Sequence, residues 1–404
     1  MATAALQEDI LVEPKPNGLT RSGAARLDAI DMLRGLVIVL MVLDHARDYF
    51  HYYALRFDPT DPSQTWPGLF ATRWITHLCA ATFVFLSGVS IWFQRANGKQ
   101  LDELSLFLVK RGVWLIFLEV TVVSFGFNFG EPFFFLQVIW AIGASMICMS
   151  LIARLPAFGG LAVGVAVLLL YPFLVPLTAG ATGALGIVRT LAIAPGPITG
   201  TPVLAFYAFV PWMAVMCLGY GLGPIYRMAA ADRTRILLPL AIGLIGAFVT
   251  LRVLNGYGDP APWSHQSEPV RTFLSFMDVS KYPPSPDYVF ITLGISILLF
   301  LALEWLRGPF ASVLLAYGRT PLFTYVIHIY ILHLMMVAAA LLAGFPLTVT
   351  THVVDSVKSM QMGWGYSLSV VYLAWLTTLA LLAPASFWFA GVKRRRRDWW
   401  LSYI

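Results

Sequence analysis

The sequence predicts an all-α protein, a polytopic integral membrane bundle of about ten transmembrane helices. Three observations lead to this fold class. Of the 404 residues, 58% are hydrophobic and only 12% are charged, about half the charged share of a soluble domain. Apolar runs of about 20 residues, enough to cross a bilayer, recur along the whole chain. The 13 Trp, 16 Tyr and 28 Phe supply aromatic side chains for the two membrane interfaces.

The runs define the expected elements in order. They lie near residues 31–52, 73–94, 106–127, 132–153, 158–178, 202–222, 236–253, 287–306, 320–343 and 366–390. Residues 1–27 are polar and lack the apolar segment of a signal peptide, so we expect a disordered cytoplasmic tail there. Residues 28–392 would form the membrane domain, and residues 393–404 a basic cytoplasmic tail.

The distribution of Lys and Arg predicts the orientation. With the N-terminus in the cytoplasm, 19 of the 27 basic residues lie on the cytoplasmic side of the predicted spans. We therefore expect both termini in the cytoplasm, longer loops at 53–72, 179–201 and 254–286 outside, and a membrane such as the bacterial inner membrane. The net charge of +6 does not indicate a nucleic-acid partner, because the basic residues gather at the ends of the spans.

The spacing of the cysteines does not indicate a metal site. Cys79, Cys148 and Cys217 lie within apolar runs and lack the spacing of metal ligands. We expect packed thiols, with neither a disulfide framework nor a metal site.

The first span contains the clearest functional candidates. Arg34 and His45 are eleven residues apart, which is about 20° more than three full helical turns, so both lie on one helix face about 16 Å apart. Asp44 adjoins His45. Charged and ionisable side chains in the hydrocarbon layer are costly, and they mark a cavity or a partner.

Two other spans place ionisable groups at a similar depth. Glu119 lies nine residues beyond Lys110 in the third span. In the ninth, Thr320 is the expected N-cap and Pro321 the first helical residue, which puts His328 about 10–12 Å into the membrane. A layer of ionisable groups above a basic entrance suggests a reaction or transport chamber.

Structural explanations compete for several of these residues. His333, alone on an apolar face, is better explained by an interhelical hydrogen bond. Glu119 is explained equally well by neutralising the charge of a nearby Arg and by a functional role. His77 is consistent with a position at the membrane interface. Asp31 is expected to form a local ion pair with Arg34.

Five blocks in order resemble the heparan-α-glucosaminide N-acetyltransferase-like membrane acyltransferases, in the bacterial type that lacks the large lumenal domain. The blocks are RLDAIDMLRG (26–35) continuing to Asp44 and His45, TFVFLSGVS (82–90), Lys110-Arg111-Gly112 with Glu119, KYPP (281–284), and GRTPLF (318–323) continuing to His328. The spacing from Arg34 to His45 is also similar to the Arg-to-His spacing in the first helix of the acyltransferase-3 enzymes.

The resemblance implies transfer of an acetyl group from cytosolic acetyl-CoA to an acceptor beyond the membrane. The donor phosphates then require the cations of Arg34, Lys110, Arg111 and Arg319. His45 becomes the base or nucleophile, oriented by Asp44 or Asp48, with His328 as second proton-transfer or oxyanion candidate. For the acceptor we expect Asp48, His77, Glu119 and Lys281.

Other functions remain open at this point. A secondary transporter or flippase for a polar or lipid-linked sugar would also use intramembrane His, Glu and Arg. A non-catalytic scaffold explains the helices but not the ionisable layer. The acceptor is an amino sugar, an envelope glycan or a small metabolite. The expected partners are membrane lipids, acetyl-CoA and that acceptor, and the sequence leaves the oligomeric state undecided.

Overall fold

The protein is a bundle of long helices with one small sheet. The computed structural model describes residues 20–52, 56–130, 132–347, 363–396 and 398–403. The helices are α1 (Thr20–Phe50), α2 (Pro67–Ile75), α3 (His77–Ala96), α4 (Leu101–Leu118), the π-helical η1 (Glu119–Val123), α5 (Ser124–Phe127), α6 (Val138–Ile152), α7 (Ala157–Leu177), α8 (Gly183–Ala192), α9 (Phe209–Tyr226), α10 (Ala230–Leu254), α11 (Pro269–Met277), α12 (Pro286–Leu303), α13 (Pro309–Arg319), α14 (Pro321–Leu342), α17 (Leu368–Arg395) and the 3-10 helix η3 (Trp399–Ser402). The strands β1 (Phe134–Leu136), β2 (Gly196–Ile198) and β3 (Val203–Ala205) form one sheet in the order β1-β3-β2.

The membrane-spanning character predicted from the sequence is confirmed, but the number of spans differs. In the described part of the chain, seven helical segments are long and apolar enough to cross a membrane: α2 with α3, α7, α9, α10, α12, α14 and α17. The other three predicted runs correspond to α1, to α4 with η1 and α5, and to α6. Helices α1 and α4 are rich in charged residues, and α6 has only 15 residues.

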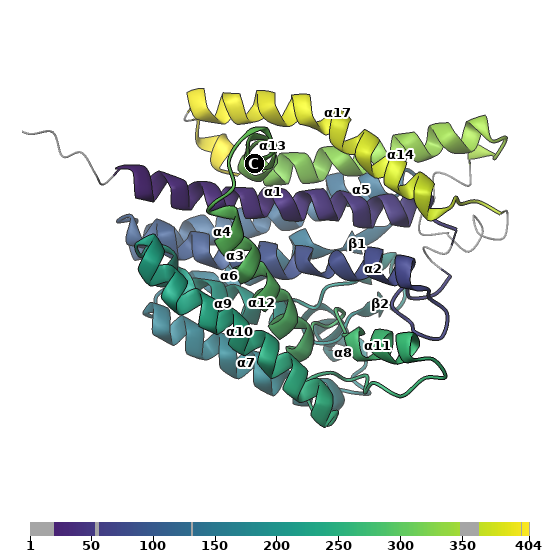
Figure 1. Cartoon of the computed structure of the whole chain (residues 1–404), viewed down its shortest axis with the longest axis horizontal. Helices are drawn as coiled ribbons and strands as arrows, with labels where there is room; N and C mark the ends of the chain where they lie inside the picture. Colours follow the sequence, from purple (N-terminus) through teal and green to yellow (C-terminus); the bar gives the residue numbers. More distant parts are fainter. Residues whose placement is uncertain (1–19, 53–55, 131, 348–362, 397, 404) are drawn as a thin grey trace, which may run out of the picture.

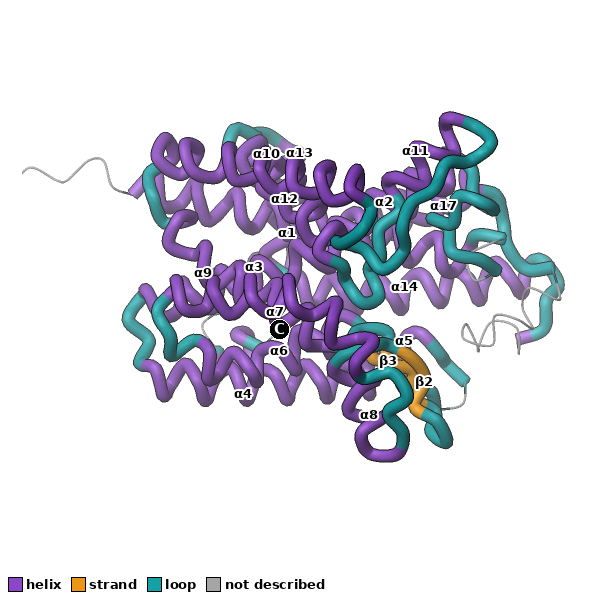
Figure 2. The backbone as a smooth tube through the Cα atoms, turned by 90° about the horizontal axis from the view of Figure 1, so that it is seen from below, coloured by secondary structure: helices purple, strands orange, loops and turns teal. Residues whose placement is uncertain are grey.

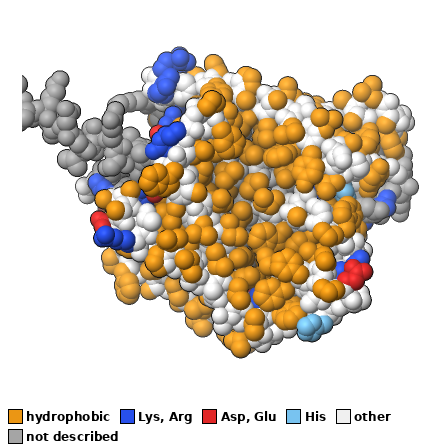
Figure 3. Space-filling view, viewed as in Figure 1, with side chains coloured by type: hydrophobic (Ala, Val, Ile, Leu, Met, Phe, Trp, Pro, Cys, Tyr) orange, Lys and Arg blue, Asp and Glu red, His pale blue; other side chains and the backbone are white. Residues whose placement is uncertain are grey.

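Helix α1 lies in the middle of the bundle. It packs against α3, α12, α13, α14 and α17, and Val37, Ile38 and Val42 on it are fully buried. Helix α1 begins and α17 ends at one end of the bundle, whereas the strands and the short helices α2, α8 and α11 lie at the opposite end (Figures 1 and 2). Figure 3 shows apolar side chains over the centre of one face and charged side chains toward its two ends, as expected for a bilayer-spanning surface.

Two glycines allow α1 and α13 to touch. A Cβ atom at Gly35 would collide with the carbonyl oxygen of Leu314, and one at Gly318 would collide with that of Asp31. Close backbone approach through small residues is typical of membrane helix pairs. The contact holds the neighbouring residues Arg34 and Arg319 at the same level of the bundle.

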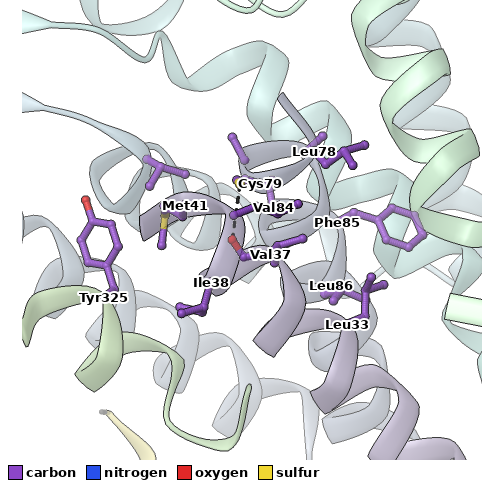
Figure 4. Packing of buried hydrophobic residues seen from close by; sticks show 14 of the residues in the cluster. Leu33, Val37, Ile38, Met41, Leu78, Cys79, Val84, Phe85, Leu86 and Tyr325 are labelled. Carbon is purple, nitrogen blue, oxygen red and sulfur yellow. Dashed lines mark hydrogen bonds between the residues drawn. The ribbon is translucent and has the colours of Figure 1, made fainter. Parts of the chain in front are cut away.

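The core beside α1 is apolar and includes a thiol. Figure 4 shows Val37 and Ile38 of α1 packed with side chains of α3, and the Sγ atom of Cys79 donates a hydrogen bond to the carbonyl oxygen of Val37 at 3.3 Å. All three cysteines are free; Cys79 and Cys217 are buried and Cys148 is half-buried. Packed thiols are therefore confirmed for Cys79 and Cys217.

Helices extend into both predicted tails. Helix α1 begins at Thr20, inside the predicted tail 1–27, whose first 19 residues lie outside the described part. Helix α17 continues to Arg395, and η3 follows it with Leu401 buried. The C-terminal segment is therefore packed against the bundle.

Candidate functional site

A cavity lined by cations opens among α1, α3, α4, α13 and α17, at the end where α1 begins. We call it the basic cavity. Its volume is about 980 Å³. Its charged lining residues in the described part of the chain are five cations and one carboxylate: Arg34, Arg111, Arg319, Lys393, Arg394 and Asp31. Such an excess of positive charge suits a polyanionic ligand.

Asp31 organises two of the cations. Its Oδ1 atom lies 2.8 Å from Nη1 of Arg34, which confirms the predicted local ion pair, and its Oδ2 atom lies 3.8 Å from Nε of Arg319. Arg34 also donates to Ser90 Oγ at 2.5 Å, and Arg319 donates to Asp28 at 2.7 Å. These contacts hold both guanidinium groups beside Asp31.

Of the two neighbouring α4 cations predicted to bind the donor phosphates, only one lines the basic cavity. Lys110 is exposed and does not line the cavity, whereas its neighbour Arg111 does. Successive helix residues point about 100° apart, so α4 can present only one of the two to the cavity.

A narrow extension leads from the basic cavity toward the middle of the bundle. Its volume is about 100 Å³. It shares Phe83, Ser87, Arg111, Met146 and Pro321 with the basic cavity. The rest of its lining is apolar except for one tyrosine: Met41, Leu115, Val138, Ile139, Ile142, Leu322 and Tyr325. We call it the apolar extension.

Beyond Tyr325 the structure brings together His45 and His328. The Nδ1 atom of His45 lies 2.7 Å from the Nε2 atom of His328. The rings are within 4° of parallel, with centroids 5.0 Å apart, a separation that fits an edge-to-edge hydrogen bond better than face stacking. Both side chains are buried, with His328 at 0% exposure and His45 at 7%.

The partners of His328 assign the tautomers of the pair. Its Nδ1 atom lies 3.1 Å from the carbonyl oxygen of Thr324. Because a carbonyl can only accept, Nδ1 of His328 carries a proton, and in a neutral ring Nε2 is then the acceptor. His45 therefore donates through Nδ1 and keeps the lone pair on its Nε2 atom. Fixing a tautomer through the other ring nitrogen is how a second residue prepares a histidine for catalysis.

Asp44 does not orient His45, contrary to one of our two predictions. Its Oδ1 and Oδ2 atoms lie 2.9 and 2.8 Å from Nη1 of Arg73, and Thr76 donates to Oδ1 at 2.9 Å. Arg47 lies 3.0 Å from the same carboxylate. The other predicted orienting group, Asp48, binds Nη2 of Arg47 at 2.5 Å.

Lys281 and His77 belong to the surroundings of Asp44. The Nζ atom of Lys281 lies 3.9 Å from Oδ2 of Asp44 and 5.1 Å from the ring centroid of Tyr282. The ring of His77 contacts Tyr288 at a centroid distance of 5.5 Å, and His77 is buried within the protein. Asp44, Arg47, Asp48, Arg73 and Lys281 form what we call the Asp44 cluster, on the side of His45 away from the basic cavity.

Glu119 caps a helix, a role the sequence did not suggest. It is fully buried, and its Oε2 atom accepts a hydrogen bond of 2.7 Å from the backbone N–H of Trp140, in the first turn of α6. Carboxylates at helix N-termini satisfy unpaired N–H groups and the helix dipole. The substrate-binding role expected for Glu119 stays a prediction. For His333, the predicted interhelical hydrogen bond is confirmed, with 2.7 Å between Nδ1 and the carbonyl oxygen of Gly126.

Several lining residues were not predicted. Lys393 and Arg394 belong to the predicted basic tail, yet both line the basic cavity. Ser87, Ser90 and Gln94 line it from one face of α3. Their spacing of three and four residues was visible in the sequence, but nothing local indicated which partner that face meets.

A family model described as heparan-alpha-glucosaminide N-acetyltransferase, catalytic, matches residues 26–249. The match covers Arg34, His45 and Arg111, whereas His328 and Arg319 lie beyond it. No match was found among curated proteins.

Proposed function

The chain belongs to the heparan-α-glucosaminide N-acetyltransferase catalytic family, and from this premise we propose that it transfers acetyl from acetyl-CoA to an amine or hydroxyl across the membrane. The observation that carries the proposal is the continuity from the basic cavity through the apolar extension to Tyr325, whose ring lies against those of His45 and His328. The anionic head of such a donor matches the basic cavity, and its slim thioester arm matches the apolar extension.

The basic cavity suits the nucleotide end of the donor. Arg34 and Arg319 present forked donors for phosphate oxygens, while Arg111, Lys393 and Arg394 add charge from two other helices. A volume of about 980 Å³ is at the upper end for a ligand pocket. Arg34 and His45 are about 16 Å apart along α1, a separation that the pantetheine arm can cover.

His45 is proposed as the base. Its Nε2 lone pair takes the proton of the acceptor amine or hydroxyl as that group attacks the thioester carbonyl carbon. The new C–N or C–O bond forms, the C–S bond breaks, and the coenzyme A thiolate leaves and recovers the proton from His45. In a second route, Nε2 itself attacks and an acetyl-His45 intermediate passes acetyl to the acceptor. Trapping with acid and mass analysis of the peptide containing His45 distinguishes the two routes.

The proposal places both termini in the cytoplasm and the Asp44 cluster on the acceptor side, in a membrane such as the bacterial inner membrane. The basic entrance at the end where α1 begins supports this orientation, because coenzyme A is cytosolic. Residues 28–392 would form the transferase domain. An amino sugar or other glycan is the proposed acceptor class.

The narrowness of the apolar extension favours transfer over transport. A volume of about 100 Å³ admits a thioester arm more readily than a whole sugar. In group transfer only the acetyl group has to pass the histidine pair, whereas a transporter has to move its entire cargo through this level.

Proteoliposomes test the proposal. Vesicles are loaded with glucosamine as a probe acceptor and receive radiolabelled acetyl-CoA outside. We expect labelled N-acetylglucosamine to form inside the vesicles. It would be made by the protein molecules whose basic cavity faces the outside of the vesicle. Loss of unmodified glucosamine from the vesicles would support the transporter, and absence of both acetyl-CoA binding and transfer would overturn the transferase.

A further inference from the structure

We propose that Tyr325 is a catalytic residue that donates a hydrogen bond from its hydroxyl group to the carbonyl oxygen of the acetyl thioester; this inference rests on the proposed function. Tyr325 lies on α14, three residues before His328. Residues three apart are neighbours on one helix face. The chain thus presents a hydroxyl and an imidazole side by side.

Tyr325 lies where the reacting group would arrive. It lines the apolar extension together with Met41 of α1. Figure 4 shows its ring rising from α14 beside Met41. Its ring centroid lies 6.3 Å from that of His45 and 5.5 Å from that of His328, both at interplanar angles of 68°. A thioester at the end of the extension would therefore contact Tyr325, whose ring lies against both histidines.

The hydroxyl group of Tyr325 is buried and makes no hydrogen bond within the described residues. Its side chain is only 3% exposed, and within the described residues its Oη atom has no hydrogen-bond partner. Buried hydroxyls normally find a partner, so an unpaired one calls for an explanation. Other buried tyrosines nearby are paired: Tyr49 donates to the carbonyl oxygen of Gly126 and Tyr288 to that of His77. A ligand carbonyl in the extension would supply the missing acceptor.

The chemistry requires such a donor. When the acceptor attacks, its N–H or O–H proton passes to Nε2 of His45 and the carbonyl oxygen takes a negative charge. A neutral phenol can donate to this oxyanion without losing its proton. When the C–S bond breaks, the electron pair leaves on sulfur and the carbonyl re-forms. The hydrogen bond strengthens as charge develops, so it lowers the barrier more than it favours donor binding.

Tyr325→Phe tests the assignment, with Tyr330→Phe as the matched control. Tyr330 lies on the same helix, but its hydroxyl donates to the carbonyl oxygen of Val122 at 2.7 Å and does not line the extension. Each variant receives three measurements in nanodiscs: transfer to glucosamine at saturating acetyl-CoA, the Kd for acetyl-CoA, and the infrared carbonyl band of bound [1-¹³C]acetyl-CoA.

We expect Tyr325→Phe to lower kcat by about 10²–10³-fold, with a nearly unchanged Kd. The carbonyl band should lie at lower frequency in the wild type and Tyr330→Phe than in Tyr325→Phe. A wild-type rate and an unshifted band in Tyr325→Phe would overturn the inference and leave the transferase intact. If the wild type binds acetyl-CoA without transferring acetyl, the proposed function fails, while the carbonyl band still decides whether Tyr325 donates. Absence of acetyl-CoA binding overturns both.

Discussion

The Nδ1 atom of His45 and the Nε2 atom of His328 are 2.7 Å apart, although 283 residues separate them in the chain. This contact joins the central helix α1 to α14 and, through the carbonyl of Thr324, leaves Nε2 of His45 as the free base. The first prediction concerns this atom.

His45→Ala should reduce acetyl transfer by at least about 10²-fold, the lower range for loss of a general base. The Kd for acetyl-CoA should stay nearly constant, because the phosphates bind about 16 Å away. Steady-state transfer and calorimetric binding of acetyl-CoA measure the two quantities. His333→Ala is the control, because its histidine, on the same helix as His328, contacts Gly126 outside the cavities. A near wild-type rate in folded, donor-binding His45→Ala protein would refute the base assignment.

Arg34→Ala should weaken acetyl-CoA binding by about 1.5–3 kcal/mol, the usual worth of a hydrogen bond to a charged group. Arg34→Lys should recover only part of the loss, because Lys cannot bind phosphate with a planar fork. Lys110→Ala is the control, since this exposed residue does not line the basic cavity. Calorimetry on purified protein compares the three variants. Equal affinities for wild type and Arg34→Ala would remove Arg34 from the donor site.

Glu119→Ala should destabilise the protein by about 0.5–2 kcal/mol, the range for losing an N-terminal helix cap. Glu119→Gln should lose less, because its amide oxygen can still accept from the backbone N–H of Trp140. Thermal unfolding in detergent measures both. Exposed Glu103, in the first turn of α4, serves as the control position. Loss of transfer without loss of stability in Glu119→Gln would instead indicate a role in the reaction.

Asp278, in the loop after α11, should make stability depend on pH. Burial raises the pKa of its carboxyl to about 6 from the ordinary 3.8, with Asp58 and Asp259 adding to the rise and a hydrogen bond from Thr60 and the charge of Arg252 opposing it. Between these two values the native state holds a proton that the unfolded chain has released. The free energy of unfolding should therefore fall as pH rises from about 4 to 6.

Asp278→Asn removes this titration. Its thermal midpoint should change less across that pH window than that of the wild type, and it should be the more stable protein at pH 7. Unfolding scans at a series of pH values compare the two, with Asp102→Asn, at an exposed position in the first turn of α4, as the control. Parallel curves for wild type and Asp278→Asn would show that this carboxyl does not titrate in the window.

Local patterns in the sequence were sufficient for the membrane class, the placement of most long helices and the start of α14. Thr320 is the N-cap and Pro321 the first residue of that helix, as predicted, although the Thr320 hydroxyl donates to Ala316 and does not cap. Arg34 and His45 share a helix face because helical periodicity depends only on residues of the same segment. The low charge content likewise needs no tertiary information to indicate a bilayer environment.

The site itself depended on contacts between distant segments. Nothing near His45 indicates that His328, and not Asp44, is its partner, because Asp44 is drawn to Arg73 from another helix. The same is true of Arg111, but not Lys110, lining the basic cavity, of Glu119 capping α6, and of Lys393 and Arg394 lining the basic cavity. A sequence specifies which face of its own helix a side chain occupies. The packing of the helices decides which other segment that face meets. The reason is that the favoured packing depends on the burial and ion-pairing energies of all helices in the bundle together.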